Sequence, residues 1–248
     1  MCHSTDSRPP AVADPGSVAG EGLIELTSQD GTTFTAFHAQ PGEPNGRGVV
    51  ILPDIRGVHA YYQELARRFA EAGFAAVVVD YYGRTAGLGP RGDDFEWQPH
   101  FQQLVPDRVA EDARAAADFL TARNPGIAVF SVGFCLGGGH SWRLAGADLG
   151  LAGSIGFYGL PGLAEDRLKD ISAPLLLLLA GNDVATTQED FAAFRGKLDD
   201  ADKTYEYKIY EGAPHSFFDG GAEEWKDVSA DAWQRVLDFT ARHAEAAA

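Results

Sequence analysis

The sequence predicts an α/β fold in which a mainly parallel sheet is covered by helices on both faces. From about residue 48 onward, short apolar runs alternate with segments of helical spacing, a pattern typical of parallel strands joined by crossover helices. Several of these runs, residues 49–52 among them, are apolar at every position, as in strands buried on both faces. The length of 248 residues suits one large domain of this class.

The N-terminal part of the chain follows a different pattern. Residues 21–28 and 32–39 read as two strands around the turn sequence Gln29-Asp30-Gly31, which predicts an antiparallel hairpin. Residues 1–19 contain Pro, Ser, Asp and Gly but no apolar run. We therefore expect a mobile tail rather than a signal peptide there, and a single domain over residues 20–243.

The remaining elements follow in order along the chain. Helices are expected at residues 59–72, 107–123, 187–198 and 224–242, and in a short segment after Gly139. Strands are expected at residues 49–52, 74–79, 127–131, 151–157, 174–180 and 204–210. Residues 85–106 lack periodicity and are rich in Gly, Pro and aromatic residues. An insertion of this kind after a parallel strand predicts a lid or a pocket wall.

Charge and composition exclude several classes of partner. Lys and Arg number 20 against 36 Asp and Glu, which gives a net charge of −16; such a field repels nucleic acid and anionic lipid. No stretch approaches the roughly 20 apolar residues of a membrane helix. The only two cysteines, Cys2 and Cys135, exclude a disulfide framework and favour a reducing compartment, so a cytoplasmic location is expected. No histidine pair has zinc spacing, and we expect neither metal nor cofactor.

The sharpest local feature is Gly133-Phe134-Cys135-Leu136-Gly137, of the form G-x-C-x-G. It directly follows the strand at 127–131 and precedes a helix, which is the context of a nucleophile elbow. A thiol at a helix N-terminus also has a lowered pKa. The alternative is a glycine-rich turn that holds a buried cysteine.

Two partners for Cys135 follow later strands in the order nucleophile, acid, histidine. Asp183 comes just after the strand at 174–180, and His215 just after the strand at 204–210. The carboxyl ends of parallel strands meet at one edge of the sheet, so we expect the three side chains to form a catalytic triad. A turn aspartate and a loop histidine are the alternatives.

Five segments together resemble the dienelactone hydrolase family over about residues 20–243. They are residues 133–138, 180–183, 212–217, 52–57 and 80–84. The resemblance implies an α/β-hydrolase fold and hydrolysis of a small ester or lactone through a thioester on Cys135, with no cofactor. It also implies an oxyanion hole formed by the backbone N–H groups of Leu136 and Ile55. Asp54 stands where the family has a glutamate that interacts with the resting thiol.

Substrate recognition departs from the family pattern. Arg84 matches one of two arginines that hold a substrate carboxylate in the family, but the other position, four residues after His215, holds Asp219. Aromatic residues are expected to line an apolar pocket suited to a neutral or aromatic ester, or to pack a lid. They include Tyr82, Trp97 and Phe217.

Three functions fit the sequence. The first is hydrolysis of a small-molecule ester or lactone by a monomer or homodimer. The second is a hydrolase of the same fold acting on another ester or thioester, which Asp219 favours. The third is a non-hydrolytic binding or redox-sensing protein that uses Cys135 as a reactive thiol.

Overall fold

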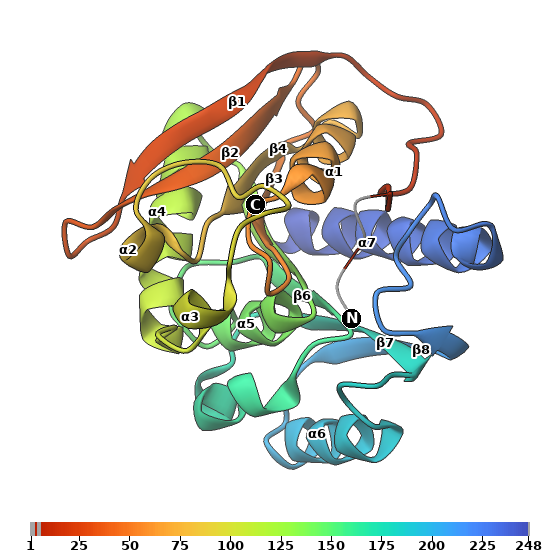
Figure 1. Cartoon of the computed structure of the whole chain (residues 1–248). Coiled ribbons are helices and arrows are strands. Elements are labelled where there is room, and N and C mark those ends of the chain that lie inside the picture. The colour runs from red at the N-terminus through yellow and green to blue at the C-terminus, as the bar shows by residue number, and fades with distance from the viewer. Residues whose placement is uncertain (1–2, 4–5, 248) are drawn as a thin grey trace.

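The computed structural model describes residue 3 and residues 6–247, with side chains through residue 244. Its described residues form an eight-stranded sheet of order β1-β2-β4-β3-β5-β6-β7-β8 (Figure 1). The strands are β1 (Val18–Thr27), β2 (Thr33–Pro41), β3 (Arg47–Leu52), β4 (Ala75–Val79), β5 (Ala128–Phe134), β6 (Gly153–Phe157), β7 (Leu175–Asn182) and β8 (Tyr205–Pro214).

Strand direction follows the predicted pattern. β1 pairs antiparallel with β2, and β2 pairs antiparallel with β4. All later pairings, from β4 through β8, are parallel. β4 and β6 are buried at every position, as expected of strands covered on both faces. The mainly parallel sheet with an N-terminal antiparallel hairpin is therefore confirmed.

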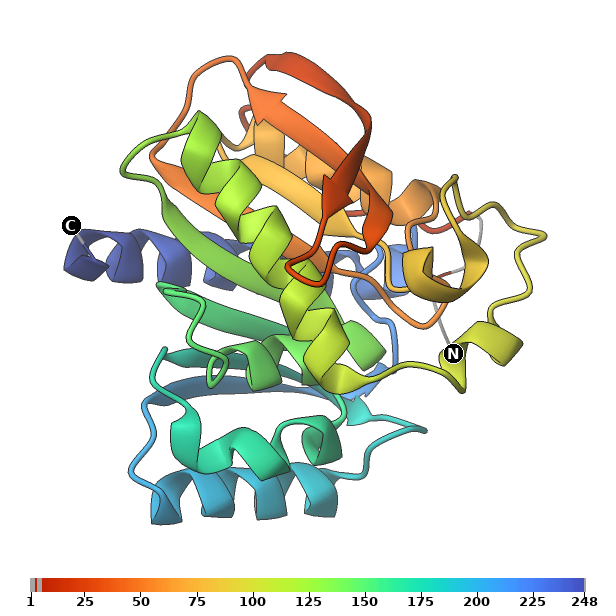
Figure 2. The ribbon, with the colours of Figure 1, turned by 90° about the vertical axis from the view of Figure 1, so that its left-hand side faces the viewer.

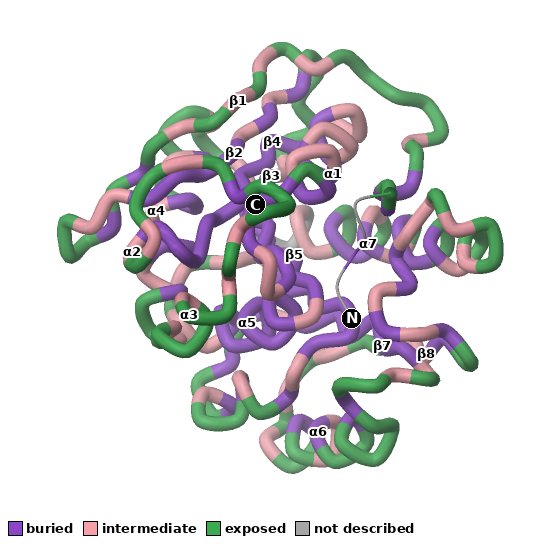
Figure 3. Tube along the Cα trace, viewed as in Figure 1, coloured by how far each residue is buried: buried purple, intermediate pink, exposed green. Residues whose placement is uncertain are grey.

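Helices cover both faces of the sheet, as Figure 2 shows for α4 in front and α7 behind. One face packs against α1 (Ala60–Glu71) and α7 (Lys226–Ala247). The other packs against α4 (Pro106–Arg123), α5 (Leu136–Leu144) and α6 (Gln188–Asp200). Burial is concentrated in the central strands between these layers (Figure 3). Of the helices in the described chain, none is long and apolar enough to cross a membrane.

The predicted insertion overlaps the end of one short helix, α2 (Gly83–Ala86), and contains another, α3 (Gln98–Phe101). Within it Arg91 is buried and forms an ion pair with Asp80 at 2.7 Å. Phe95 stacks on His100 with ring centroids 5.3 Å apart. This segment is thus packed by its own aromatic side chains and is tied to Asp80, just after β4, by Arg91.

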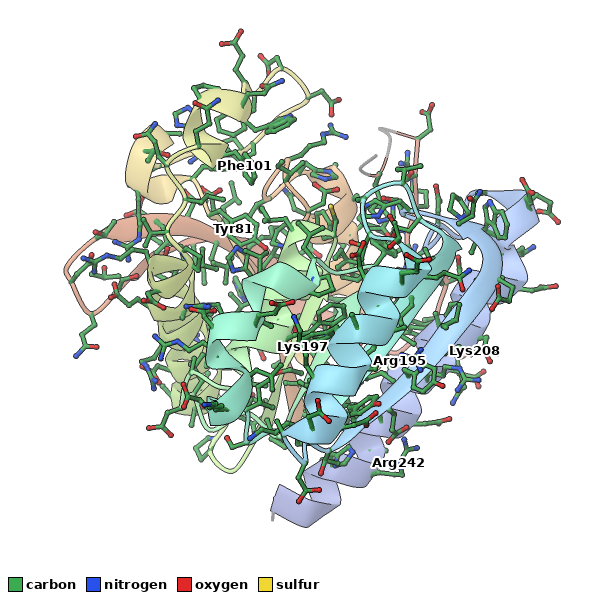
Figure 4. The ribbon with its side chains drawn as sticks, turned by 90° about the horizontal axis from the view of Figure 1, so that it is seen from below. Tyr81, Phe101, Arg195, Lys197, Lys208 and Arg242 are labelled. Atoms are coloured by element: carbon green, nitrogen blue, oxygen red, sulfur yellow. The ribbon has the colours of Figure 1, made fainter. Side chains whose placement is uncertain are left out.

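β8 is an edge strand of the sheet, and charged side chains on the strand and on the helices α6 and α7 lie along this edge. Lys208 on the strand lies with Arg195 of α6 and Arg242 of α7 along this side of the molecule (Figure 4). Arg242 pairs with Glu206 at 2.8 Å, and the Arg195 guanidinium lies 4.0 Å from the centre of the Tyr207 ring. Charged side chains at an exposed edge oppose pairing with another strand.

The N-terminal segment, which we define as residue 3 and residues 6–17, lies against the domain. Gly16 N–H donates to the Glu71 carbonyl at 2.8 Å, and Gly42 N–H donates to the Ser17 carbonyl at 2.7 Å. Val18 and Ala19 already belong to β1, so the first strand begins two residues before the predicted domain boundary. Cys2 lies outside the described residues.

Candidate active site

The residues predicted to act together lie at the carboxyl edge of the parallel strands. Cys135 directly follows β5, Asp183 follows β7 and His215 follows β8. Asp54 comes two residues after β3. Neighbouring parallel strands all present their carboxyl ends at one edge, which brings together residues that are far apart in sequence.

The turn at Cys135 has the strained geometry of a nucleophile elbow. Cys135 has φ 56° and ψ −116°, a region that residues with a side chain rarely occupy. A Cβ at Gly133 would overlap the Gly137 carbonyl, and a Cβ at Gly137 would overlap the Leu52 carbonyl. Both flanking glycines are therefore required for α5 to follow β5 this closely.

His215 is held by Asp183. Its Nδ1 lies 2.9 Å from both carboxylate oxygens of Asp183. Because an ionised carboxylate only accepts hydrogen bonds, Nδ1–H must donate and Nε2 is left for the thiol side. The His215 and Asp183 side chains are 2% and 0% exposed, so this ion pair is shielded from water.

The His215 ring is also hydrogen-bonded to Cys135. Burial lowers the pKa of His215, but the hydrogen bonds to Asp183 and Cys135 outweigh it and raise the pKa to about 9. An imidazolium beside the sulfur favours the thiolate. Cys135 as a residue is intermediate between buried and exposed. The structure thus brings Cys135, His215 and Asp183 into contact in the predicted order.

The predicted oxyanion donors lie on two segments that touch. Leu136 is the first residue of α5, so its N–H is outside the helical hydrogen-bond ladder. The close approach of Gly137 to the carbonyls of Leu52 and Pro53 places the residue 53–55 loop against this helix end. Tyr82 fixes the loop further, because its hydroxyl donates to the Ile55 carbonyl.

Asp54 is a buried carboxylate in the same loop. It is 1% exposed, and its Oδ1 accepts from the Arg56 N–H at 2.8 Å. Burial raises the pKa of Asp54, but His59, His3 and the Arg56 N–H outweigh it and lower the pKa below its usual range. Its Oδ2 has no hydrogen-bond partner among the described residues, which leaves an acceptor available at the site.

Arg84, predicted to hold a substrate carboxylate, is paired with carboxylates of the fold. Its guanidinium pairs with Asp112 at 2.7 Å, with Asp30 across the β1–β2 turn, and with Glu111. These carboxylates neutralise its charge within the fold. Arg84 therefore ties α4 to the N-terminal hairpin.

The aromatic residues predicted for the pocket differ in their surroundings. Phe217 is 1% exposed and packs against Tyr158 and Tyr210 with ring centroids 5.4 and 4.9 Å away. Tyr82 is fully buried beneath the insertion. Trp97 is partly buried and meets Phe101 edge-on at 6.2 Å. Phe217 and Tyr82 thus contribute to the core that supports the site.

Two residues at the site were not predicted from the sequence. Tyr158 directly follows β6, has φ 37°, and its ring lies 4.9 Å from the His215 ring. His3 is 2% exposed, and its Nε2 lies 3.0 Å from the Tyr158 hydroxyl. The position of Tyr158 at a strand end is a signal that could have found it. His3 had no such signal, because it lies in a segment without periodicity.

No set of three or more His, Cys, Asp or Glu side chains in the described part of the chain is arranged to hold a metal ion. The arrangement that the residues do form suits nucleophilic attack by a thiol assisted by a histidine.

Comparisons with known proteins point to one family. The model of the dienelactone hydrolase family matches residues 34–244. A Salmonella typhi protein named as a carboxymethylenebutenolidase is 28% identical over 250 residues, with 95% of this chain and 92% of that protein covered. A crystal structure from Klebsiella pneumoniae, named as a dienelactone hydrolase, has a TM-score of 0.77 and 26% identity and covers 91% of this chain and 99% of that chain.

Proposed function

We propose that this chain, which belongs to the dienelactone hydrolase family, hydrolyses its ester or lactone substrate through a covalent thioester on Cys135. The single observation that supports this most strongly is the geometry of the turn. Cys135 adopts a positive φ at the start of α5, and the His215 ring that contacts it is held by Asp183 at 2.9 Å. A buried structural cysteine needs none of these features.

In the first half of the reaction, the Cys135 thiolate attacks the carbonyl carbon and the carbonyl π electrons move to oxygen. The N–H groups of Leu136 and Ile55 stabilise the resulting oxyanion. Collapse breaks the bond to the leaving oxygen, which takes a proton from the His215 imidazolium. The products are the released alcohol or ring-opened end and a thioester on Cys135.

In the second half, neutral His215 takes a proton from water and the hydroxide attacks the thioester carbon. The oxyanion forms again in the same place. Its collapse expels the Cys135 thiolate and leaves a carboxylic acid. His215 is again an imidazolium beside a thiolate, so the starting pair is restored. Asp183 holds the ring orientation and stabilises its positive charge throughout.

Asp54 is proposed to couple thiol ionisation to substrate arrival, as the resemblance implies for the matching glutamate. Its burial and its unpartnered Oδ2 support this role. A negative charge near the sulfur would favour the protonated thiol while the His215 imidazolium favours the thiolate, so substrate arrival would shift this balance toward the thiolate that attacks. The pair of cysteines in the chain supports a cytoplasmic setting, in which a free catalytic thiol stays reduced.

The experiment that tests the proposal is steady-state hydrolysis of three substrates by the wild-type protein and by Cys135→Ala. The substrates are a carboxylated dienelactone, a neutral aryl ester and a simple lactone. We expect turnover of at least one by the wild type, and a loss of about 10³-fold or more in Cys135→Ala. Equal turnover by both proteins would refute the thiol mechanism. Absence of turnover on all three by a folded wild type would favour the thiol-sensor function.

A further inference from the structure

Two adjacent tyrosines after β4 hold the loop that follows β3. The Tyr81 hydroxyl donates to the Pro53 carbonyl at 2.8 Å, and the Tyr82 hydroxyl donates to the Ile55 carbonyl. Because β3 and β4 are parallel neighbours, both tyrosines leave the sheet at the same edge as this loop. Their rings meet edge-on, with centroids 6.2 Å apart and an interplanar angle of 83°. The two hydroxyls thus hold different carbonyls of one loop.

The peptide group between these two carbonyls carries the N–H of Ile55. Its own carbonyl, that of Asp54, accepts from the Gly57 N–H at 3.1 Å. Three successive carbonyls of the loop are therefore held, and together they fix the plane of the peptide group that joins residues 54 and 55. In the part of the chain that the structure describes, the Ile55 N–H has no backbone acceptor. This N–H is held in place and is available to a ligand.

The first turn of α5 carries a second N–H of this kind and touches the same loop. The Leu136 N–H, directly after Cys135, has no backbone acceptor among the described residues. A Cβ at Gly137 would lie 2.4 Å from the Pro53 carbonyl oxygen, so the loop and the helix end are in contact. The carbonyl that Tyr81 holds is therefore also the one that packs against the start of α5.

Burial protects the two tyrosine hydrogen bonds from competition by water. Tyr81 is 2% exposed and Tyr82 is fully buried. Burial also raises the pKa of Tyr81 well above its usual range, so its hydroxyl keeps the proton that it donates. The backbone at Tyr82 is fixed in turn, because its N–H donates to Asp80 Oδ1 at 3.1 Å and Asp80 pairs with Arg91. The loop after β3 is thus held by a rigid neighbour.

We propose that Tyr81 and Tyr82 are positioning residues for the oxyanion hole, and that their hydroxyls hold the loop so that the Ile55 N–H meets the oxyanion formed on the substrate. The inference rests on the proposed hydrolysis, in which this N–H acts together with that of Leu136. Each tyrosine hydroxyl is bonded to a carbonyl, so it acts through the backbone and not on the substrate. Donors that are held in place stabilise developing charge without having to reorient, and a displacement of about 1 Å can cost about 10²-fold in rate.

The first test measures steady-state hydrolysis of a neutral aryl ester by variants that lose only a hydroxyl. They are Tyr81→Phe, Tyr82→Phe, the double variant and the control Tyr210→Phe, which removes a buried hydroxyl of β8 that donates to Asp231 at 2.7 Å. Each single loop variant should lose about 10-fold in kcat, with KM within about twofold of the wild type. The double variant should lose about 30-fold or more, up to the roughly 10²–10³-fold that loss of one oxyanion donor costs.

The division between kcat and KM separates this role from a purely structural one. Tyr210→Phe should keep kcat within about twofold of the wild type, because its hydroxyl does not hold the loop. A rise in KM with unchanged kcat in the loop variants would show that the tyrosines shape substrate binding, and would overturn the proposal. An unchanged kcat in the double variant would also overturn it, as would an equal loss in Tyr210→Phe.

A second measurement needs no turnover. An aryl aldehyde forms a hemithioacetal with Cys135, in which the thiolate sulfur adds to the carbonyl carbon and the oxygen, after carrying the negative charge, takes up a proton. Its dissociation constant follows from protection of Cys135 against iodoacetamide, measured on the Cys135 peptide by mass spectrometry. The double variant should bind the aldehyde about 10-fold or more weakly than the wild type. Its alkylation rate without aldehyde should stay within about twofold, because displacement of iodide forms no oxyanion.

The two measurements distinguish failure of this inference from failure of the proposed hydrolysis. If the wild type hydrolyses no ester but binds the aldehyde more tightly than the double variant, the positioning role is upheld and the proposed hydrolysis is refuted. Equal aldehyde affinity in the wild type and the double variant would overturn the positioning role even where hydrolysis through Cys135 is confirmed. A wild type that does not bind the aldehyde at all would overturn it as well.

Discussion

Replacement of Asp183 by asparagine should lower the pKa of His215 and remove stability in a defined pH range. The exchange keeps the shape of the side chain and removes its charge. The wild-type pKa of about 9 against the ordinary 6.5 corresponds to about 3 kcal/mol of preference for the imidazolium in the folded protein. The His215 side chain is 2% exposed, so water screens little of this.

The pH range in which the Asp183–His215 pair stabilises the fold follows from the upward shift of the His215 pKa. Because the folded protein holds the His215 proton more tightly than the unfolded chain, this stabilisation is fully present below pH 6.5 and is lost as the pH rises through about 9. Asp183→Asn should therefore lower the free energy of unfolding by roughly 1–3 kcal/mol at pH 6 and by clearly less at pH 10.

The assay has two readouts. Imidazole resonances followed by NMR give the His215 pKa. This pKa should fall by more than about one unit in Asp183→Asn, because burial lowers it and the Asp183 carboxylate no longer raises it. Guanidinium unfolding at pH 6 and pH 10 gives the stability. Cys135→Ala serves as the comparison, because it removes the other side chain that raises the His215 pKa and should also lower that pKa. An unchanged His215 pKa in Asp183→Asn would refute the reasoning.

Three further predictions test the supports of the site. Gly133→Ala should lower stability by more than about 3 kcal/mol in denaturant unfolding, because its Cβ would overlap the Gly137 carbonyl; a wild-type midpoint would contradict this. Phe217→Ala should lower stability by about 3–5 kcal/mol, as expected for a fully buried ring, and a change below about 1 kcal/mol would place it outside the core. Arg84→Gln should lower stability by roughly 2 kcal/mol, since it leaves buried Asp112 without its ion pair, with kcat/KM on neutral esters within about twofold of the wild type. A selective loss of activity on carboxylated esters would instead give Arg84 a substrate role.

The strands, and the meeting of Cys135, Asp183 and His215 at one edge of the sheet, could be predicted from the sequence for physical reasons. Residues 49–52 are apolar at every position, and such a run has few alternatives to a central strand. Cys135 is flanked by glycines, and only glycine leaves room for the turn. His215 and Asp183 lie 32 residues apart in sequence, but a parallel sheet brings strand ends together whatever the loop lengths.

The ion pairs of Arg84 and the position of His3 could not be predicted in the same way. Arg84 carries the same charge whether it faces a substrate or pairs with Asp112, and only the tertiary structure decides between them. His3 lies in a segment held by backbone hydrogen bonds and by single side chains, such as Asp219 and Arg56. Contacts of this kind leave no periodic pattern in the sequence.

Detection of the acyl-enzyme tests the central claim most directly. A neutral aryl ester is mixed with the protein, quenched in acid within the first turnover and analysed by intact-protein and peptide mass spectrometry. We predict a mass increase equal to the acyl group, located on the peptide that contains Cys135 and absent from Cys135→Ala. Hydrolysis without this adduct, or an adduct on another residue with full turnover by Cys135→Ala, would contradict the thioester mechanism.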